Sequence, residues 1–218
     1  MSFGASWRSN AVAIEVKICG ITDPDDARQA LACGADYLGF VLYARSPRAV
    51  SPERVREIRE QLEPGARCVA VVVDPERGMV EALIHDAQLH AVQFCGNESP
   101  EDLAGFDVPV WRSLRLGEGG WQPAAPAQWA VERYVIDANV PGEFGGTGCR
   151  ADWAGGAALA REYPVMLSGG LTPENVASGI KAVRPCGVDV ASGVEAEPGK
   201  KDHARVKAFI EAARAAGD

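Results

Sequence analysis

The sequence predicts an α/β protein that forms a single-domain (β/α)8 TIM barrel. Short apolar runs alternate with amphipathic, N-capped segments along the chain, giving about eight β-then-α units in about 200 residues. A length of 218 residues with 47% hydrophobic content suits one core. An open doubly wound sheet would alternate in the same way, but no G-x-G-x-x-G follows the first strand. We expect residues 11–218 to form the barrel and residues 1–10 to be a flexible extension.

Eight short apolar runs, many rich in β-branched residues, are the expected strands. They are residues 14–19, 37–42, 68–73, 91–94, 108–114, 134–137, 165–168 and 188–191. In a barrel the catalytic groups lie on the loops that follow the strands, so each candidate residue can be judged by whether it falls there.

Helix starts are indicated where proline follows an N-cap residue. This pattern occurs at Asp23-Pro24, Ser51-Pro52, Asp74-Pro75 and Thr172-Pro173. The helix after the fifth strand has the weakest support, because residues 117–128 are rich in Gly, Pro and Ala.

Charge and composition exclude several classes of partner. Lysine and arginine number 22 against 30 acidic residues, a net charge of −8, and no basic run is present. A nucleic-acid or anionic-membrane surface is therefore not expected, and any phosphate must be bound locally. Residues 1–10 hold one arginine and no apolar core of a signal peptide, so we expect a cytoplasmic protein with no membrane anchor.

The cysteines and histidines predict neither disulfides nor a metal site. Six cysteines occur at irregular spacings without a C-x-x-C, which is typical of reduced thiols. The three histidines have no ligand spacing, so no structural metal is expected.

Cys19 ends the first expected strand, in V-K-I-C-G-I-T at residues 16–22. A thiol at the C-terminal end of a barrel strand lies where such enzymes place their chemistry. A single buried cysteine is more often a small hydrophobic residue, so the later loops must decide its role.

Glycine-rich turns follow the last three strands. Glycine permits backbone conformations in which successive N–H groups face one anion, and barrels commonly bind phosphate after strands seven and eight. Such a loop taken alone can also be merely flexible. The expected phosphate-binding residues are Gly145, Gly146, Gly148, Gly169, Gly170, Ser192 and Gly193.

Two further strand-end residues supply complementary chemistry. Asp137 ends the sixth strand, across the barrel from Cys19, and a carboxyl facing a thiol provides an acid and a base. Its alternative role is a loop cap. Arg48 follows the second strand with Arg45, and guanidinium binds a planar carboxylate through two hydrogen bonds. The alternative for Arg48 is solvation at the surface.

Strand alternation places Lys17 on the same face as Cys19, one layer below the thiol if that face is the interior. A nearby ammonium favours the thiolate. An interior lysine needs a counter-charge, for which Asp189 on the eighth strand is the candidate. Both charges could instead reach solvent at a rim.

Eight motifs follow one another along the chain: K-I-C-G-I-T at 17–22, G-A-D-Y-L-G-F at 34–40, S-P-R at 46–48, V-V-V-D-P at 71–75, V-Q-F at 92–94, G-G-T-G at 145–148, L-S-G-G-L-T-P-E-N-V at 167–176 and G-V-D-V-A-S-G-V-E at 187–195. Taken together, in this order and over nearly the whole chain, they resemble the phosphoribosylanthranilate isomerase family of tryptophan biosynthesis.

The resemblance implies an Amadori rearrangement of N-(5-phosphoribosyl)anthranilate without metal or organic cofactor. Asp137 would protonate the ribose ring oxygen and Cys19 would take the C2′ proton. Arg48 would hold the anthranilate carboxylate, and backbone N–H groups near Gly146, Gly170 and Gly193 the phosphate. The partner is thus a small phosphorylated aminosugar; a monomer and a homodimer both remain open.

The chain departs from the family pattern at two places. Phe94-Cys95-Gly96 stands where Leu-His-Gly is usual, and residues 149–153 read C-R-A-D-W in place of K-T-F-D-W. Both lie beside the expected acid and base. Two alternatives stay open: the related histidine-pathway isomerase, which uses aspartate at the strand-one position and two phosphate sites, and a non-catalytic phospho-sugar binding barrel.

Overall fold

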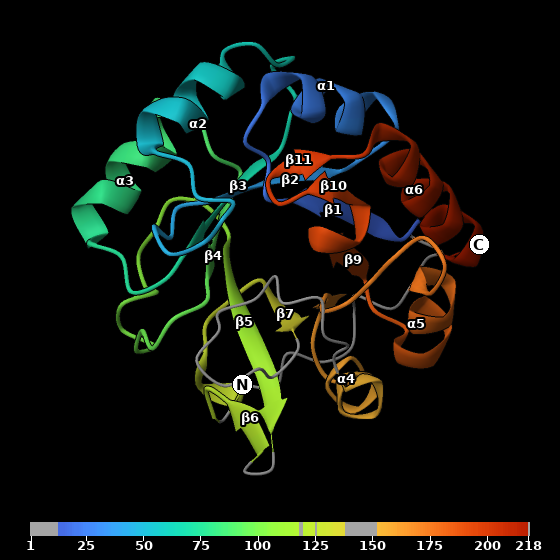
Figure 1. Ribbon diagram of the computed structural model, residues 1–218. Coiled ribbons are helices and arrows are strands. Elements are labelled where there is room, and N and C mark those ends of the chain that lie inside the picture. Colours follow the sequence, from blue (N-terminus) through green and yellow to red (C-terminus); the bar gives the residue numbers. More distant parts are fainter. Residues whose placement is uncertain (1–12, 118–119, 125, 138–151, 218) are drawn as a thin grey trace.

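The computed structural model describes residues 13–117, 120–124, 126–137 and 152–217, and its parallel strands form a closed barrel (Figure 1). The strand order β4-β3-β2-β1-β9-β8-β7-β5 closes through the pairing of β4 with β5, and the (β/α)8 prediction is confirmed. The barrel strands are β1 (Glu15–Cys19), β2 (Tyr37–Val41), β3 (Cys68–Val72), β4 (Ala91–Phe94), β5 (Val110–Gly117), β7 (Arg133–Asp137), β8 (Val165–Leu167) and β9 (Gly187–Val190).

The helices lie on the outside of the barrel strands (Figure 1). They are α1 (Pro24–Ala32), α2 (Pro52–Arg59), α3 (Arg77–Asp86), α4 (Trp153–Leu159), α5 (Val176–Val183) and α6 (His203–Gly217). Each buries apolar residues against the outer face of the sheet, as Val55 and Ile58 of α2 and Phe209 of α6 do. No helix in the described part of the chain has the length and apolar character needed to cross a membrane.

Two predicted helix starts are confirmed. The Asp23 side chain accepts the N–H of Asp25 at the start of α1. Ser51 accepts the N–H of Arg54 at the start of α2. In both, proline occupies the first helical position, where its missing N–H costs nothing.

The other two predicted starts are displaced, because the cap residues make different contacts. Asp74 has a φ of +44°, and its carboxylate accepts the backbone N–H of Asn97 in the loop after β4, so α3 begins later. Thr172 donates its N–H to the Asn175 side chain within a turn that precedes α5. Asp74 and Thr172 thus fix loops instead of capping helices directly.

The expectation of a helix after every strand is wrong at two places. After β4, residues 95–109 form turns and irregular backbone. After β5, the chain turns back as the antiparallel strand β6 (Gly120–Gln122), followed by the 3₁₀ turn η1 (Pro126–Gln128). Glycine and proline interrupt the helical period in both segments.

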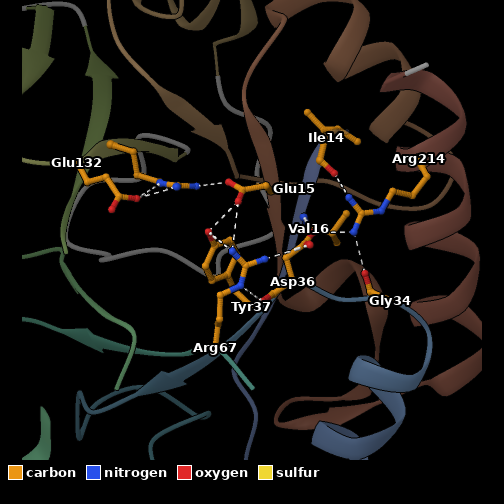
Figure 2. Close-up of polar contacts among 10 residues, drawn as sticks. Ile14, Glu15, Val16, Gly34, Asp36, Tyr37, Arg67, Glu132 and Arg214 are labelled. Carbon is orange, nitrogen blue, oxygen red and sulfur yellow. Dashed lines mark hydrogen bonds and ion pairs between the residues drawn. The ribbon is translucent and has the colours of Figure 1, made fainter. Parts of the chain in front are cut away.

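The barrel interior is filled by inward-facing side chains, which alternate with those packed on the helices. One cluster consists of Tyr37, Val69, Ala91, Trp111, Val135 and Met166. At the N-terminal end of the strands, Glu15 contacts Arg133 and Arg67 and accepts the Tyr37 hydroxyl at 2.8 Å (Figure 2).

The five described cysteines, Cys19, Cys33, Cys68, Cys95 and Cys186, are free thiols, as predicted for them. The predicted extension at residues 1–10, the sixth cysteine, Cys149, and the predicted glycines Gly145, Gly146 and Gly148 lie outside the described residues.

Candidate active site

Cys19 ends β1 at the C-terminal end of the barrel, and its thiol is nearly buried. The residue beside it in register on β2 is Gly39. A Cβ at Gly39 would lie 2.7 Å from the Cys19 Sγ and 2.9 Å from the Lys17 Cε. The missing side chain of Gly39 is therefore what leaves room for both groups.

Lys17 lies on the same face, with its ammonium fully buried. Its Nζ donates to the Asp189 Oδ1 at 3.1 Å and to the Gln93 Oε1 at 3.0 Å. Lys17 and Asp189 are also register partners on β1 and β9, so the predicted interior pair is confirmed. The other end of the Gln93 amide is also held, because its Nε2 donates to the Ser113 Oγ at 3.0 Å.

Opposing effects act on the Cys19 thiol. Burial raises its pKa above the ordinary value, and the Asp189 carboxylate adds to this. The charges of Lys17 and Lys201, together with a hydrogen bond from Lys17, act in the opposite direction. The expected effect of Lys17 on the thiol is therefore present, but desolvation outweighs it.

Arg48 is buried beside Cys19, in the loop between β2 and α2. Its Nε donates to Glu195 Oε1 at 2.8 Å and one Nη donates to Glu195 Oε2 at 2.7 Å. Gly20, with a φ of +73°, allows this approach, because a Cβ there would lie 2.6 Å from the Arg48 Cδ. Arg48 thus already holds a carboxylate of its own chain, and it is not the surface residue of the alternative interpretation.

Glu195 and Lys201 belong to a hairpin of β10 (Glu195–Glu197) and β11 (Lys200–Lys201), which follows β9. The Lys201 Nζ lies 2.9 Å from the Glu195 Oε1 and 3.4 Å from the Ala191 carbonyl oxygen. Neither residue was predicted from the sequence as part of the site. Glu195 falls in the motif at 187–195, but no sequence pattern separates the buried Lys201 from the exposed Lys200 beside it.

Asp137 ends β7 at the same end of the barrel as Cys19. Its register partner on β5 is Arg115. In the strand order, β9 and β8 separate β1 from β7, so the thiol and the carboxyl come from distant parts of one rim. This is where barrel enzymes gather their reactive groups.

The glycine turns after β8 and β9 lie against one another. Gly169 and Gly170 have φ values of +83° and +62°, conformations that favour glycine. Gly193 follows Ser192 in the 3₁₀ turn η2 (Ser192–Val194), and a Cβ on it would lie 1.8 Å from the Leu171 carbonyl oxygen. The two turns expected to bind phosphate are therefore neighbours.

Cys95, one of the two departures from the family pattern, is buried at the same end of the barrel. Its Sγ lies 3.0 Å from the Ser113 Oγ, and the Gln93 side chain donates to it at 3.5 Å. Burial raises its pKa to about 11, so this thiol is neutral at pH 7 and does not replace the charge of an imidazolium. The second departure falls at residues 149–153, of which 149–151 lie outside the described residues.

The fold and these contacts define a class: a (β/α)8-barrel enzyme whose thiol, carboxyl and buried cations gather at the C-terminal end, beside paired glycine turns. The family model for N-(5′-phosphoribosyl)anthranilate isomerase matches residues 16–212. The chain belongs to this family.

Relatives and solved structures agree with this family. The chain is 42% identical to N-(5′-phosphoribosyl)anthranilate isomerase of Moorella thermoacetica over 205 residues, which is 93% of this chain and 91% of the relative. It is similar to the Thermotoga maritima enzyme, with a TM-score of 0.83, 36% identity and coverage of 93% and 99%. A phosphoribosyl anthranilate isomerase in complex with reduced 1-(o-carboxyphenylamino)-1-deoxyribulose 5-phosphate has a TM-score of 0.79, 35% identity and the same coverage.

Proposed function

We propose that this enzyme converts N-(5′-phosphoribosyl)anthranilate to 1-(2-carboxyphenylamino)-1-deoxyribulose 5-phosphate, an aldose-to-ketose isomerisation in tryptophan biosynthesis. Family membership supports the reaction, and a similar structure binds the reduced form of this product. The observation that carries the proposal is the position of Cys19, a strand-end thiol beside the buried ammonium group of Lys17.

Asp137 acts first, as the general acid. It gives a proton to the ribose ring oxygen while the bond between that oxygen and C1′ breaks, and the amine lone pair forms an iminium. The positive iminium then acidifies the proton on C2′.

Cys19 acts second, as the general base. Its thiolate takes the C2′ proton, and the electron pair of that C–H bond neutralises the iminium to give an enolamine. The enolamine tautomerises to the ketone. The buried ammonium of Lys17 favours the thiolate that this step needs.

Arg48 and the glycine turns hold the two ends of the substrate. Arg48, oriented by its two hydrogen bonds to Glu195, attracts the anthranilate carboxylate. Backbone N–H groups near Gly170 and Gly193 bind the phosphate, with those near Gly146. The partner is thus a small phosphorylated aminosugar. The free thiols of the described cysteines support a reducing compartment, and we place the enzyme in the cytoplasm.

Substitution of the acid and the base tests this assignment. Cys19→Ala and Asp137→Asn should each lower kcat by about 10²- to 10⁴-fold, because neither replacement can transfer the proton. The assay follows the fluorescence of phosphoribosylanthranilate made in situ. Cys33→Ala, a thiol at the end of α1, is the control and should leave kcat unchanged. A kcat like that of the wild type in Cys19→Ala would refute the role of Cys19.

A further inference from the structure

Lys201 is a buried cation that the proposed chemistry does not require. Its side chain has 0% exposure, although the neighbouring Lys200 on the same short strand is 69% exposed. Burial lowers the pKa of Lys201, in spite of the nearby Glu195 carboxylate, so keeping the charged form here costs free energy. A fold that only needed to close this hairpin would do so at lower cost with an apolar side chain.

Glu195 joins Lys201 to Arg48. Its Oε1 accepts the Arg48 Nε at 2.8 Å, the Lys201 Nζ at 2.9 Å and the Gly199 N–H at 3.3 Å, while its Oε2 accepts the second bond from Arg48. Burial acts to raise the pKa of Glu195, but these two cations hold it below the usual range. One carboxylate therefore pairs with two cations.

Among the residues that the structure describes, the charged groups around Cys19 do not balance. Three cations and two carboxylates lie at this end of the barrel, on β1, β9, the β2–α2 loop and the β10–β11 hairpin: Lys17, Arg48, Lys201, Asp189 and Glu195. The Lys201 Nζ contacts the carbonyl of Ala191, and Ala191 packs against the cluster that holds Cys19. The thiol also packs in a cluster with Val71 and the neutral Cys95, and Asp137 lies across the rim on β7. The three cations exceed the two carboxylates by one positive charge, which an anion at the thiol would offset.

We infer that Lys201 is a positioning residue for the base: its charge favours the Cys19 thiolate, and through Glu195 it fixes the guanidinium of Arg48. The inference rests on the proposed function for the roles of Cys19 and Arg48. Lys201 suits this task because it is held from two sides, by Glu195 and by the Ala191 carbonyl, and cannot turn toward solvent.

The test compares Lys201→Met with wild type. The rate at which iodoacetamide alkylates Cys19 reports the thiolate, and mass spectrometry of the Cys19 peptide separates it from the other cysteines. Loss of the ammonium should move the midpoint of alkylation up by about one pH unit, and the acid limb of kcat/KM by the same amount. Glu195 keeps Arg48 as a partner in this variant, so no buried charge is left unpaired.

Two variants control for structural damage. Lys200→Met removes an exposed lysine from the same strand and should move neither profile. Lys201→Arg keeps the charge and should restore the wild-type alkylation midpoint. If circular dichroism shows that Lys201→Met is unfolded, Lys201→Gln replaces it, because its amide can still donate to Glu195.

An unmoved alkylation midpoint in a folded Lys201→Met or Lys201→Gln protein would overturn the inference. Alkylation needs no turnover, so this result is independent of the proposed reaction. Retained activity in Cys19→Ala would refute the catalytic assignment and leave the alkylation result unaffected.

Discussion

The two ends of the barrel both carry networks of charged side chains, but their charges add up differently. At the N-terminal end, three guanidiniums meet three carboxylates in Arg67, Arg133, Arg214, Glu15, Asp36 and Glu132 (Figure 2). At the C-terminal end, the described residues around Cys19 include three cations and two carboxylates. The charges of the first network cancel, and the second network has one excess positive charge.

The balanced network links elements that are distant in the sequence. The Asp36 carboxylate accepts the Val16 N–H at 2.7 Å and an Arg214 Nη at 2.7 Å, and Arg214 also donates to the Gly34 carbonyl at 2.9 Å. The last helix, α6, is thereby fixed to the start of β1. Such contacts stabilise barrel closure, and they leave no charge for chemistry.

The comparison indicates that the number of buried ion pairs says little about function. Whether the positive and negative charges of a cluster balance says more. A pair whose partners satisfy each other gives stability or specificity. A cluster with one excess cation attracts an anion, here the thiolate or the carboxylate of a bound substrate.

Lys17→Met should have the largest effect on stability. It leaves Asp189 as a buried carboxylate without its cation, which costs about 3–5 kcal/mol in the free energy of unfolding. Urea unfolding measures this loss. The same change removes a positive charge beside Cys19, so the acid limb of kcat/KM should move to higher pH.

A second substitution separates pairing from general damage. Lys17→Met combined with Asp189→Asn should cost much less than the sum of the single changes, because the unpaired charge is gone. Additive losses, together with an unmoved acid limb, would show that the pair neither interacts strongly nor acts on the thiol.

Arg133→Met should have an intermediate effect, confined to stability. Arg133 pairs with Glu15 and Glu132, and its guanidinium lies 4.7 Å from the centre of the Trp111 ring. Its loss should cost about 2–3 kcal/mol, less than a fully buried pair, since Glu15 keeps Arg67 and Tyr37 as partners. The pH profile of kcat/KM should be unchanged. A shifted acid limb would contradict the conclusion that charged groups at the N-terminal end of the barrel affect stability alone.

Most of the fold could be predicted because it depends on local patterns. The strand β4 has the predicted bounds, and the caps Asp23 and Ser51 act as expected, since short apolar runs and cap residues act over a few positions. The start after Asp74 was wrong because a hydrogen bond to Asn97 in another loop decides its conformation. No local pattern carries that information.

The contacts of the site also fall into those that local patterns predict and those that they do not. Alternation on β1 was enough to predict that Lys17 and Cys19 share a face, and barrel closure then brought Asp189 to Lys17. The contact of Arg48 with Glu195 spans 147 positions in the sequence and depends on how a hairpin folds over the barrel mouth. Sequence spacing cannot predict such a contact, so the second carboxylate of the site was found only in the structure.

Glu15→Gln should have the smallest effect, a loss of stability that depends on pH. Burial acts to raise the pKa of Glu15, but Arg133, Tyr37 and Arg67 together hold it below the usual value. A carboxyl whose pKa is lowered by folding contributes stability above its unfolded pKa, about 4.3, and loses it as the pH falls through the folded pKa. Glu15→Gln should therefore be about 1–2 kcal/mol less stable than wild type at pH 7.

The difference in the free energy of unfolding between wild type and Glu15→Gln should disappear as the pH falls, because a protonated Glu15 resembles the glutamine. Urea unfolding at pH 7 and at about pH 3 measures it. The exposed Glu101 gives the control, since Glu101→Gln should show no gap at either pH. A gap that stayed constant with pH would mean that shape, and not charge, accounts for the loss. The balanced network would then hold the barrel end by packing, and the contrast with the charged rim around Cys19 would be greater still.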